Sequence, residues 1–168
     1  MTNRIDPGNQ ILIRQGTPDD LPQVMGLIRE LAEYEKAPHE VENSVELMKK
    51  DGFGAHPLFG FLVAGSGARI VGISLYYYRY STWKGKMLYL EDLIVTESFR
   101  KKGIGKKLFE GTIEVARKTE CSGMIWQVLD WNKPAFDFYR KYDPIIDPQW
   151  VTCKLTKKQI DEFKAGES

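Results

Sequence analysis

The chain has 168 residues and a formal net charge of +1, with 42% hydrophobic and 28% charged residues. These values predict a globular protein with a substantial core, and they argue against disordered or collagen-like chains. A charge so close to zero provides no overall field that would attract a nucleic acid or an anionic membrane.

The sequence also argues against a membrane anchor and an oxidising compartment. The longest apolar run, 58–64, is far shorter than the ~20 residues that span a bilayer. Residues 1–10 lack the apolar segment of a secretion signal. Two cysteines are too few for a disulfide framework, and two distant histidines do not favour a metal site. We therefore expect a cytoplasmic protein without a metal ion.

The N-terminal part predicts a lead-in, a strand and two helices. Residues 1–10 are polar and predict a flexible lead-in to a single domain over residues 11–168. A first strand is predicted at 11–14, and Thr-Pro-Asp-Asp then begins a helix over 17–35. A shorter helix is predicted over 44–50, which ends at a pair of glycines.

The middle of the chain predicts three antiparallel strands. Residues 58–64, 70–80 and 86–95 are rich in β-branched and aromatic residues, and turns that contain glycine separate them. Such a run is typical of a meander.

The C-terminal part alternates again between helices and strands. The predicted elements are a helix over 103–118, a strand at 124–129, a helix over 134–142, a strand at 151–155 and a helix over 156–164. The order strand 86–95, helix, strand 124–129 predicts parallel neighbours. The fold class is therefore α/β (mixed α+β), with a central mixed, mostly antiparallel sheet flanked by helices on both faces.

A glycine-containing basic turn joins the strand 86–95 to the following helix, with the sequence RKKGIG from Arg100 to Gly105. Its unpaired N–H groups and nearby lysines suit an oxyanion, although a tight turn with a solvated basic face remains open. A P-loop would need glycine where Arg100 stands and Ser or Thr where Lys107 stands. A dinucleotide fingerprint would need glycine or alanine in place of Leu108.

The pattern R-x-x-G-x-G resembles the pyrophosphate-binding turn of the GCN5-related N-acetyltransferase (GNAT) superfamily. Further segments resemble its diamine acetyltransferase branch: 30–35, 51–54 with 56–57, 88–92, and 131–132 with 138–139. Within that branch, 80–85 and 128–132 resemble the thialysine N-ε-acetyltransferase type more than the polyamine type. The polyamine type carries an acid where Ser81 stands.

The resemblance implies a GNAT-like sheet and acetyl-CoA as co-substrate, without a metal. Coenzyme contacts are implied for the end of a strand, the basic turn and the start of a later helix. These residues are Leu93, Ile94, Val95, Lys101, Lys102, Gly103, Ile104, Gly105, Lys106, Asn132, Lys133, Pro134, Ala135 and Tyr139.

Acetyl transfer to an amine needs a base and an acid, because an alkylammonium has a pKa near ~10 and a thiolate must leave. The resemblance implies that Glu91 is the base, through a water, and that Tyr139 is the acid. Asp92 would point to the other face of a regular strand, unless a bulge turns both acids toward the site. The acceptor-binding residues implied are Tyr34, Glu35, Trp83, Glu91, Asp92, Ile125, Trp126 and Gln127.

Plainer interpretations remain open for several of these residues. Glu91 and Asp92 would then simply end a strand, Tyr139 would belong to a helix core, and Trp83 would pack on the sheet.

The chain departs from the branch after Tyr139, where a glycine is usual and Arg140 stands instead. The segment that runs to Trp150 is shorter, carries Pro144 and Pro148, and lacks the acid that crosses the dimer interface of the polyamine enzymes. A homodimer remains the expectation from the resemblance.

We expect an N-acetyltransferase for a small thialysine- or lysine-like amine. The alternatives are a polyamine N1-acetyltransferase and a non-catalytic acyl-CoA-binding module. Nucleic-acid binding is the weakest hypothesis, because the basic patch is confined to 100–107.

Overall fold

The computed structural model describes residues 10–163, so the predicted lead-in lies outside the described residues except for Gln10. The chain divides into two compact units, Met1–Gln127 and Val128–Ser168, and each is described by itself. The single domain over 11–168 stays a prediction. Within the described range, no helix combines the length and apolar character needed to cross a membrane.

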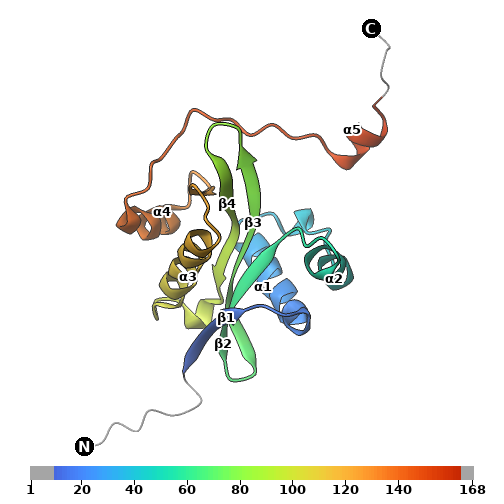
Figure 1. Ribbon diagram of the computed structural model, residues 1–168. Coiled ribbons are helices and arrows are strands. Elements are labelled where there is room, and N and C mark those ends of the chain that lie inside the picture. The colour runs from blue at the N-terminus through green and yellow to red at the C-terminus, as the bar shows by residue number, and fades with distance from the viewer. Residues whose placement is uncertain (1–9, 164–168) are drawn as a thin grey trace, which may run out of the picture. The chain divides into compact units, whose positions relative to one another are not determined.

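The first unit is built on a five-stranded sheet in the order β1-β2-β3-β4-β5 (Figure 1). The strands are β1 (Ile11–Gln15), β2 (Gly60–Ser66), β3 (Arg69–Ser81), β4 (Gly85–Val95) and β5 (Met124–Trp126). Neighbours from β1 to β4 pair antiparallel, and β4 and β5 pair parallel. The predicted fold class and the predicted parallel pair are therefore confirmed.

The helices of this unit follow the predicted spans closely. They are η2 (Pro18–Asp20), α1 (Leu21–Tyr34), η3 (Pro38–Glu40), α2 (Val45–Phe53), η4 (Glu97–Phe99) and α3 (Ile104–Lys118). Ser44 caps α2 by accepting a hydrogen bond from the backbone N–H of Leu47 at 3.1 Å. The predicted strand 124–129 is too long, because the pairing between β5 and β4 ends at Leu90 opposite Trp126.

Helices cover both faces of the sheet, with α1 and α2 on one face and α3 on the other (Figure 1). Alternation along β3 divides its side chains between them. Ile73 and Leu75 belong to the core cluster that includes residues of α1. On the opposite face, the Ser74 and Thr112 hydroxyls lie 2.5 Å apart, so Ser74 contacts α3.

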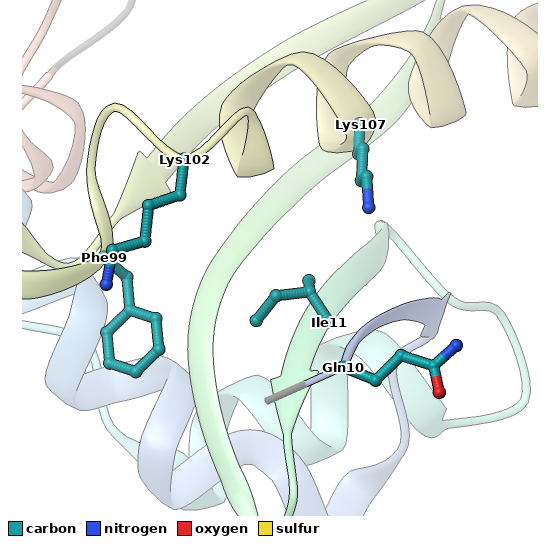
Figure 2. Close-up of a pocket in the computed structure, with 5 residues that line it drawn as sticks. All are labelled: Gln10, Ile11, Phe99, Lys102 and Lys107. Carbon is teal, nitrogen blue, oxygen red and sulfur yellow. The ribbon is translucent and has the colours of Figure 1, made fainter. Parts of the chain in front are cut away.

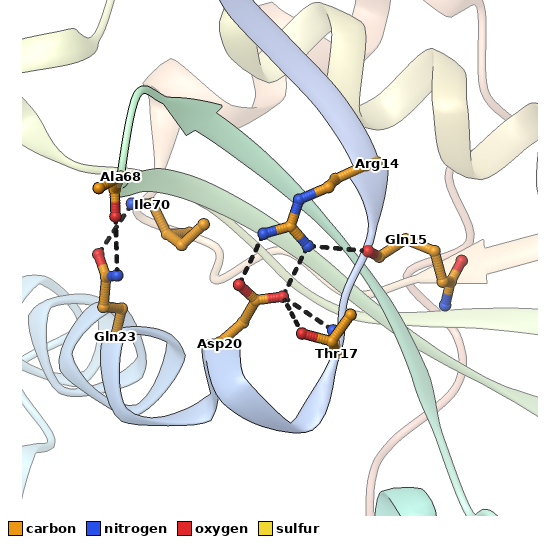
Figure 3. Close-up of polar contacts among 7 residues, drawn as sticks. All are labelled: Arg14, Gln15, Thr17, Asp20, Gln23, Ala68 and Ile70. Carbon is orange, nitrogen blue, oxygen red and sulfur yellow. Dashed lines mark hydrogen bonds and ion pairs between the residues drawn. The ribbon is translucent and has the colours of Figure 1, made fainter.

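A buried carboxylate fixes the start of α1 against β1 (Figure 3). Asp20 is 7% exposed, and its two oxygens accept hydrogen bonds from the Arg14 guanidinium, each at 2.7 Å. One of the same oxygens also accepts from the backbone N–H of Thr17 at 2.8 Å. Hydrogen bonding to Arg14, against the cost of burial, lowers the pKa of Asp20 to about 2. The pair stabilises the junction of strand and helix.

The second unit contains three helical segments: α4 (Lys133–Tyr139), η5 (Arg140–Tyr142) and α5 (Lys157–Asp161). Thr156 caps α5 with a capping box, as predicted, whereas residue 164 of that predicted helix lies outside the described residues. The predicted strand 151–155 is wrong, because residues 143–156 form neither helix nor strand. A strand needs a hydrogen-bonded neighbour, and no described strand pairs with this segment.

Candidate active site

The turn between β4 and α3 presents backbone N–H groups. Gly103 is the N-cap residue of α3 with φ 76°, a left-handed conformation that glycine adopts without strain. The first helical hydrogen bond runs from the Lys107 N–H to the Gly103 carbonyl at 3.1 Å. The N–H groups of Ile104 and Gly105 therefore precede the helical ladder and have no intrahelical acceptor. Such a turn can hold an anion.

The lysines of this turn are not equivalent. Lys106 pairs with Glu110 one helical turn later, at 2.5 Å. The Lys102 ammonium lies 4.7 Å from the centre of the Phe99 ring. Two of the lysines predicted to supply positive charge at the turn therefore already interact with neighbouring side chains of the protein.

Arg100, the first residue of the R-x-x-G-x-G pattern, turns back toward the sheet and α1. Its Nε donates a hydrogen bond to the Val95 carbonyl at 2.9 Å. One of its terminal nitrogens lies 3.5 Å from a carboxylate oxygen of Glu30, and its guanidinium lies 5.3 Å from the centre of the Tyr34 ring. Arg100 therefore connects the turn to the C-terminal end of α1.

The C-terminal half of β4 has an open edge. Residues 92–95 pair with β3 on one side, whereas pairing with β5 covers only Leu88, Leu90 and the residue between them. Among the described strands, none pairs with the other edge of Leu93, Ile94 and Val95. An extended amide-containing ligand could pair there as an added strand.

A β-bulge interrupts β4 at Glu91. Leu75 lies opposite Asp92 and Tyr76 lies opposite Leu90, so Glu91 has no counterpart on β3. Asp92 therefore shares the sheet face of Leu75, which is the face covered by α1. The bulge that would turn both acids toward one site is thus present.

The charge of Glu91 acts on an aromatic pair that lies on this face. Tyr77 and Tyr89 lie opposite each other with stacked rings, 5.0 Å between centres. Burial and then the negative charge of Glu91 raise the pKa of both tyrosines. This aromatic pair was not identified from the sequence. The available signal was the alternation along the two strands, which places Tyr77 and Tyr89 on the same face of the sheet.

Three carboxylates gather on this face, here called the acidic face: Glu35 at the end of α1, and Glu91 and Asp92 on the bulge. Burial, and then the charges of Glu91 and Glu35, raise the pKa of Asp92 to about 7. Burial also raises the pKa of Glu35. A cationic ligand would relieve this repulsion, so the face suits an ammonium group.

The other predicted acceptor residues of this unit are more scattered. Trp83 is 85% exposed in the turn between β3 and β4, which is roughly 20 Å along β4 from Glu91. Trp126 contacts Phe109 of α3 edge-on at 5.3 Å, whereas Ile125 lies opposite Tyr89 and shares its face. Gln127 follows the end of β5.

A cavity of about 360 Å³ lies beside the turn (Figure 2). Its lining residues are Gln10, Ile11, Phe99, Lys102 and Lys107. Lys102 is the only predicted coenzyme residue among them, and none of the three carboxylates contributes. This cavity is therefore separate from the acidic face.

In the second unit, the predicted residues cluster on α4. The Asn132 side chain caps the helix by accepting from the Ala135 N–H at 3.3 Å. Lys133 begins α4 and lines a cavity of about 460 Å³ with Asp130, Phe136 and Arg140.

Tyr139 ends α4, and its ring contacts that of Phe138 at 5.0 Å between centres. Burial raises the pKa of Tyr139, so its hydroxyl keeps the proton at neutral pH. The same helix therefore contributes a protonated hydroxyl at its end and, through Pro134, a stiff first turn.

No cluster of three or more His, Cys, Asp or Glu side chains suited to a metal ion occurs among residues 10–163.

Comparisons with known proteins identify the family of the chain. The model of the "Acetyltransferase (GNAT) family" matches residues 24–143. A thialysine N-epsilon-acetyltransferase of Bos taurus is 44% identical over 138 residues, which cover 77% of this chain and 81% of that protein. One of Caenorhabditis elegans is 36% identical over 150 residues, which cover 88% and 92%.

Solved structures extend the likeness to three dimensions. An aminoglycoside acetyltransferase from an uncultured soil metagenomic sample, in complex with trehalose, has a TM-score of 0.73 and 25% identity. The match covers 87% of this chain and 95% of that one. The predicted resemblance is confirmed, and so is the prediction of an enzyme: the chain belongs to the acetyltransferase (GNAT) family.

Proposed function

We propose that this acetyltransferase transfers the acetyl group of acetyl-CoA to the terminal amine of a small thialysine- or lysine-like cation. The observation that carries the proposal is the bulge at Glu91, which turns two carboxylates toward one face, where Glu35 adds a third. Relatives named thialysine N-epsilon-acetyltransferase support the choice of acceptor.

Acetyl-CoA fits the residues of the turn and of β4. The N–H groups of Ile104 and Gly105 would bind its diphosphate, with charge supplied by Lys101, Lys102 and Lys106. The open edge of Leu93, Ile94 and Val95 would pair with the amide-containing arm. Bound there, the coenzyme supplies the acetyl group as a thioester, and a backbone N–H of β4 would polarise its carbonyl. Asn132, Lys133, Pro134 and Ala135 complete the proposed contacts.

The acidic face would bind the acceptor. Glu35 and Asp92 attract its ammonium groups, and the Tyr77–Tyr89 pair offers a flat apolar wall. Tyr34, Trp83, Ile125, Trp126 and Gln127 remain proposed contacts for the rest of the molecule.

Two proton transfers complete the proposed chemistry. Glu91 is exposed on the bulge and would accept the proton of the attacking ammonium through a water. Tyr139 would donate its proton to the leaving thiolate, because its raised pKa keeps that proton in place beforehand. The same burial disfavours the tyrosinate, so solvent must return the proton rapidly.

A panel of amines tests the proposal. Purified protein with acetyl-CoA should release thiol with thialysine or lysine at a higher kcat/KM than with spermidine. A higher kcat/KM for spermidine would favour the polyamine alternative, which relates to a human relative named spermidine/spermine N(1)-acetyltransferase-like protein 1. Tight coenzyme binding without turnover on any amine would indicate an acyl-CoA-binding module.

Substitutions separate the two acids. Glu91→Gln should lower kcat by about a hundredfold or more, because general bases contribute that much. Asp92→Asn should raise the KM of the amine by about tenfold, as for the loss of a charge-assisted hydrogen bond. Unchanged turnover and an unchanged pH profile in Glu91→Gln would remove Glu91 from the mechanism.

Tyr139→Phe tests the acid. This variant should lose most of its turnover and bind coenzyme A as tightly as the wild type, measured by calorimetry. Wild-type turnover in the variant would contradict the assignment.

We also propose a homodimer in the cytoplasm. Trp150 is 77% exposed and Val151 is 84% exposed, which supports burial of this segment in an assembly. Cys121 and Cys153 are unpaired, which supports a reducing compartment.

A further inference from the structure

The side chain of Arg100 contacts three residues of the first unit, one at the end of β4 and two on α1. The Val95 carbonyl at the end of β4 accepts from Nε at 2.9 Å. Glu30 and Tyr34 of α1 contact the charged end, at 3.5 Å to a carboxylate oxygen and 5.3 Å to the ring centre. A planar guanidinium presents its donors in a rigid fork and also stacks on an aromatic ring, an arrangement that the compact ammonium of lysine does not reproduce.

Glu30 strengthens this connection on its own account. The same oxygen that faces Arg100 accepts a hydrogen bond from the Glu97 N–H at 2.9 Å. Glu97 begins the 3-10 helix η4, which leads directly into the basic turn. Glu30 therefore ties α1 both to the backbone before the turn and to the side chain at its start.

The contacts of Arg100 with α1 lie next to the acidic face. Glu35 follows Tyr34 directly, and its charge acts on Asp92 across the face. Helix α1 ends here, because Lys36 has φ 62°. The last turn of a helix frays easily unless side chains fix it. A cation also lies over the Tyr34 ring already, so a second cation on that face would be repelled.

We propose that Arg100 is a positioning residue for the acceptor, which holds the end of α1 through Glu30 and Tyr34 so that Glu35 faces Asp92. This inference rests on the proposed function of the acidic face. It assigns Arg100 a role other than binding phosphate. It also assigns Tyr34 to the contacts that hold Arg100, here called the Arg100 cluster (Arg100, Glu30 and Tyr34), rather than to the ammonium group of the acceptor.

Kinetics of Arg100→Lys and Glu30→Gln test the proposal. Both variants should raise the KM of the amine by about tenfold, which is the scale of one charged contact. The Kd of coenzyme A, measured by calorimetry, should change by less than about threefold because the backbone N–H groups of the turn remain. A loss of coenzyme affinity equal to the loss in amine KM would overturn the proposal in favour of a phosphate ligand.

A double variant tests whether Arg100 acts through Glu35. Glu35→Gln with Arg100→Lys should raise the amine KM no further than Glu35→Gln alone, because coupled residues are non-additive. Additive losses would overturn the proposal. Arg117→Lys and Glu114→Gln are matched controls at an exposed ion pair on α3, and they should leave both constants unchanged.

Hydrogen exchange provides a readout that does not need acetyl transfer. Arg100→Lys should accelerate exchange of the backbone N–H groups of residues 33–36 relative to wild type and to Arg117→Lys. If the wild type acetylates no amine but this acceleration is seen, the proposed function is contradicted, whereas the role of the Arg100 cluster in fixing the end of α1 is supported. An unchanged exchange rate would contradict the proposal that the Arg100 cluster fixes the end of α1.

Discussion

The two units of the chain bury very different amounts of apolar surface. The buried core residues run from Leu21 to Ala116, so all of them belong to the first unit. Among the described residues after Gln127, none is fully buried, and Ile145 is 97% exposed. Burial of apolar surface is the main favourable contribution to folding. The first unit can therefore hold its sheet with its own core, whereas the described residues of the second unit form no comparable core.

The largest expected effect lies in the core of the first unit. Phe61 is 1% exposed, and its ring contacts Phe53 and Phe59 at 6.0 and 6.2 Å between centres. Phe61→Ala should lower the free energy of unfolding by about 4 kcal/mol, as expected for a large cavity. Urea denaturation followed by circular dichroism measures this. A loss below about 1 kcal/mol would contradict the assignment of the core to this unit.

The next effect concerns the anchor of α1. Because the pKa of Asp20 is about 2 in the folded protein and 3.8 for an ordinary aspartate, its stabilising contribution is fully present well above pH 3.8 and is lost as pH falls toward 2. The difference corresponds to roughly 2 kcal/mol. Asp20→Asn should remove this contribution at pH 7 and flatten the dependence of unfolding free energy on pH between 4 and 2. An unchanged acid dependence in the variant would contradict the pair with Arg14.

A smaller effect is expected where α3 meets the sheet. The Thr112 hydroxyl donates to the Leu108 carbonyl at 2.9 Å, so Ser74 must donate in the short contact between the two hydroxyls. Ser74→Ala should cost about 1 kcal/mol of unfolding free energy, because Thr112 keeps its own acceptor. Denaturation of this variant beside Ser66→Ala, on the same sheet but less buried, measures the difference. A stabilised Ser74→Ala would contradict this donor assignment.

The smallest effect on the isolated chain lies in the second unit. Trp150→Ala should change the unfolding free energy at high dilution by less than about 0.5 kcal/mol, because an exposed side chain loses little on truncation. At higher concentration the same change should weaken self-association, measured by analytical ultracentrifugation. A monomer at all concentrations for the wild type would contradict the proposed dimer.

The sequence predicts the first unit well because each of its elements follows a local rule. Thr17 and Pro18 mark a helix start, and Gly103 marks the turn before α3. Alternation along β3 and β4 predicts a two-faced sheet. What it cannot locate is the bulge, since only the pairing with β3 reveals that Glu91 has no counterpart. The contacts of Arg100 are equally hidden, because its partner Glu30 lies far away in the sequence: the hydrogen bond from Glu97 to Glu30 alone spans 67 positions.

The sequence predicts the second unit less well for the converse reason. Residues 151–155 have the composition of a strand, but composition does not supply the neighbour that a strand requires. The helix α4 is predicted correctly because Asn132 and Pro134 provide local start signals. Tyr139 lies at its end as expected, while its chemical role stays a prediction.

The single inserted residue in β4 divides that strand into two halves, and the residues that face α1 are odd-numbered in one half and even-numbered in the other. Before position 91, odd-numbered residues such as Tyr89 face α1, and after it even-numbered ones such as Asp92 and Ile94 do. Deleting Glu91 would join the halves into a regular strand in which the remaining residues keep their present faces, so one acid and the change of phase would be lost together. The length of β4, as much as its composition, thus determines that this enzyme has an acidic face.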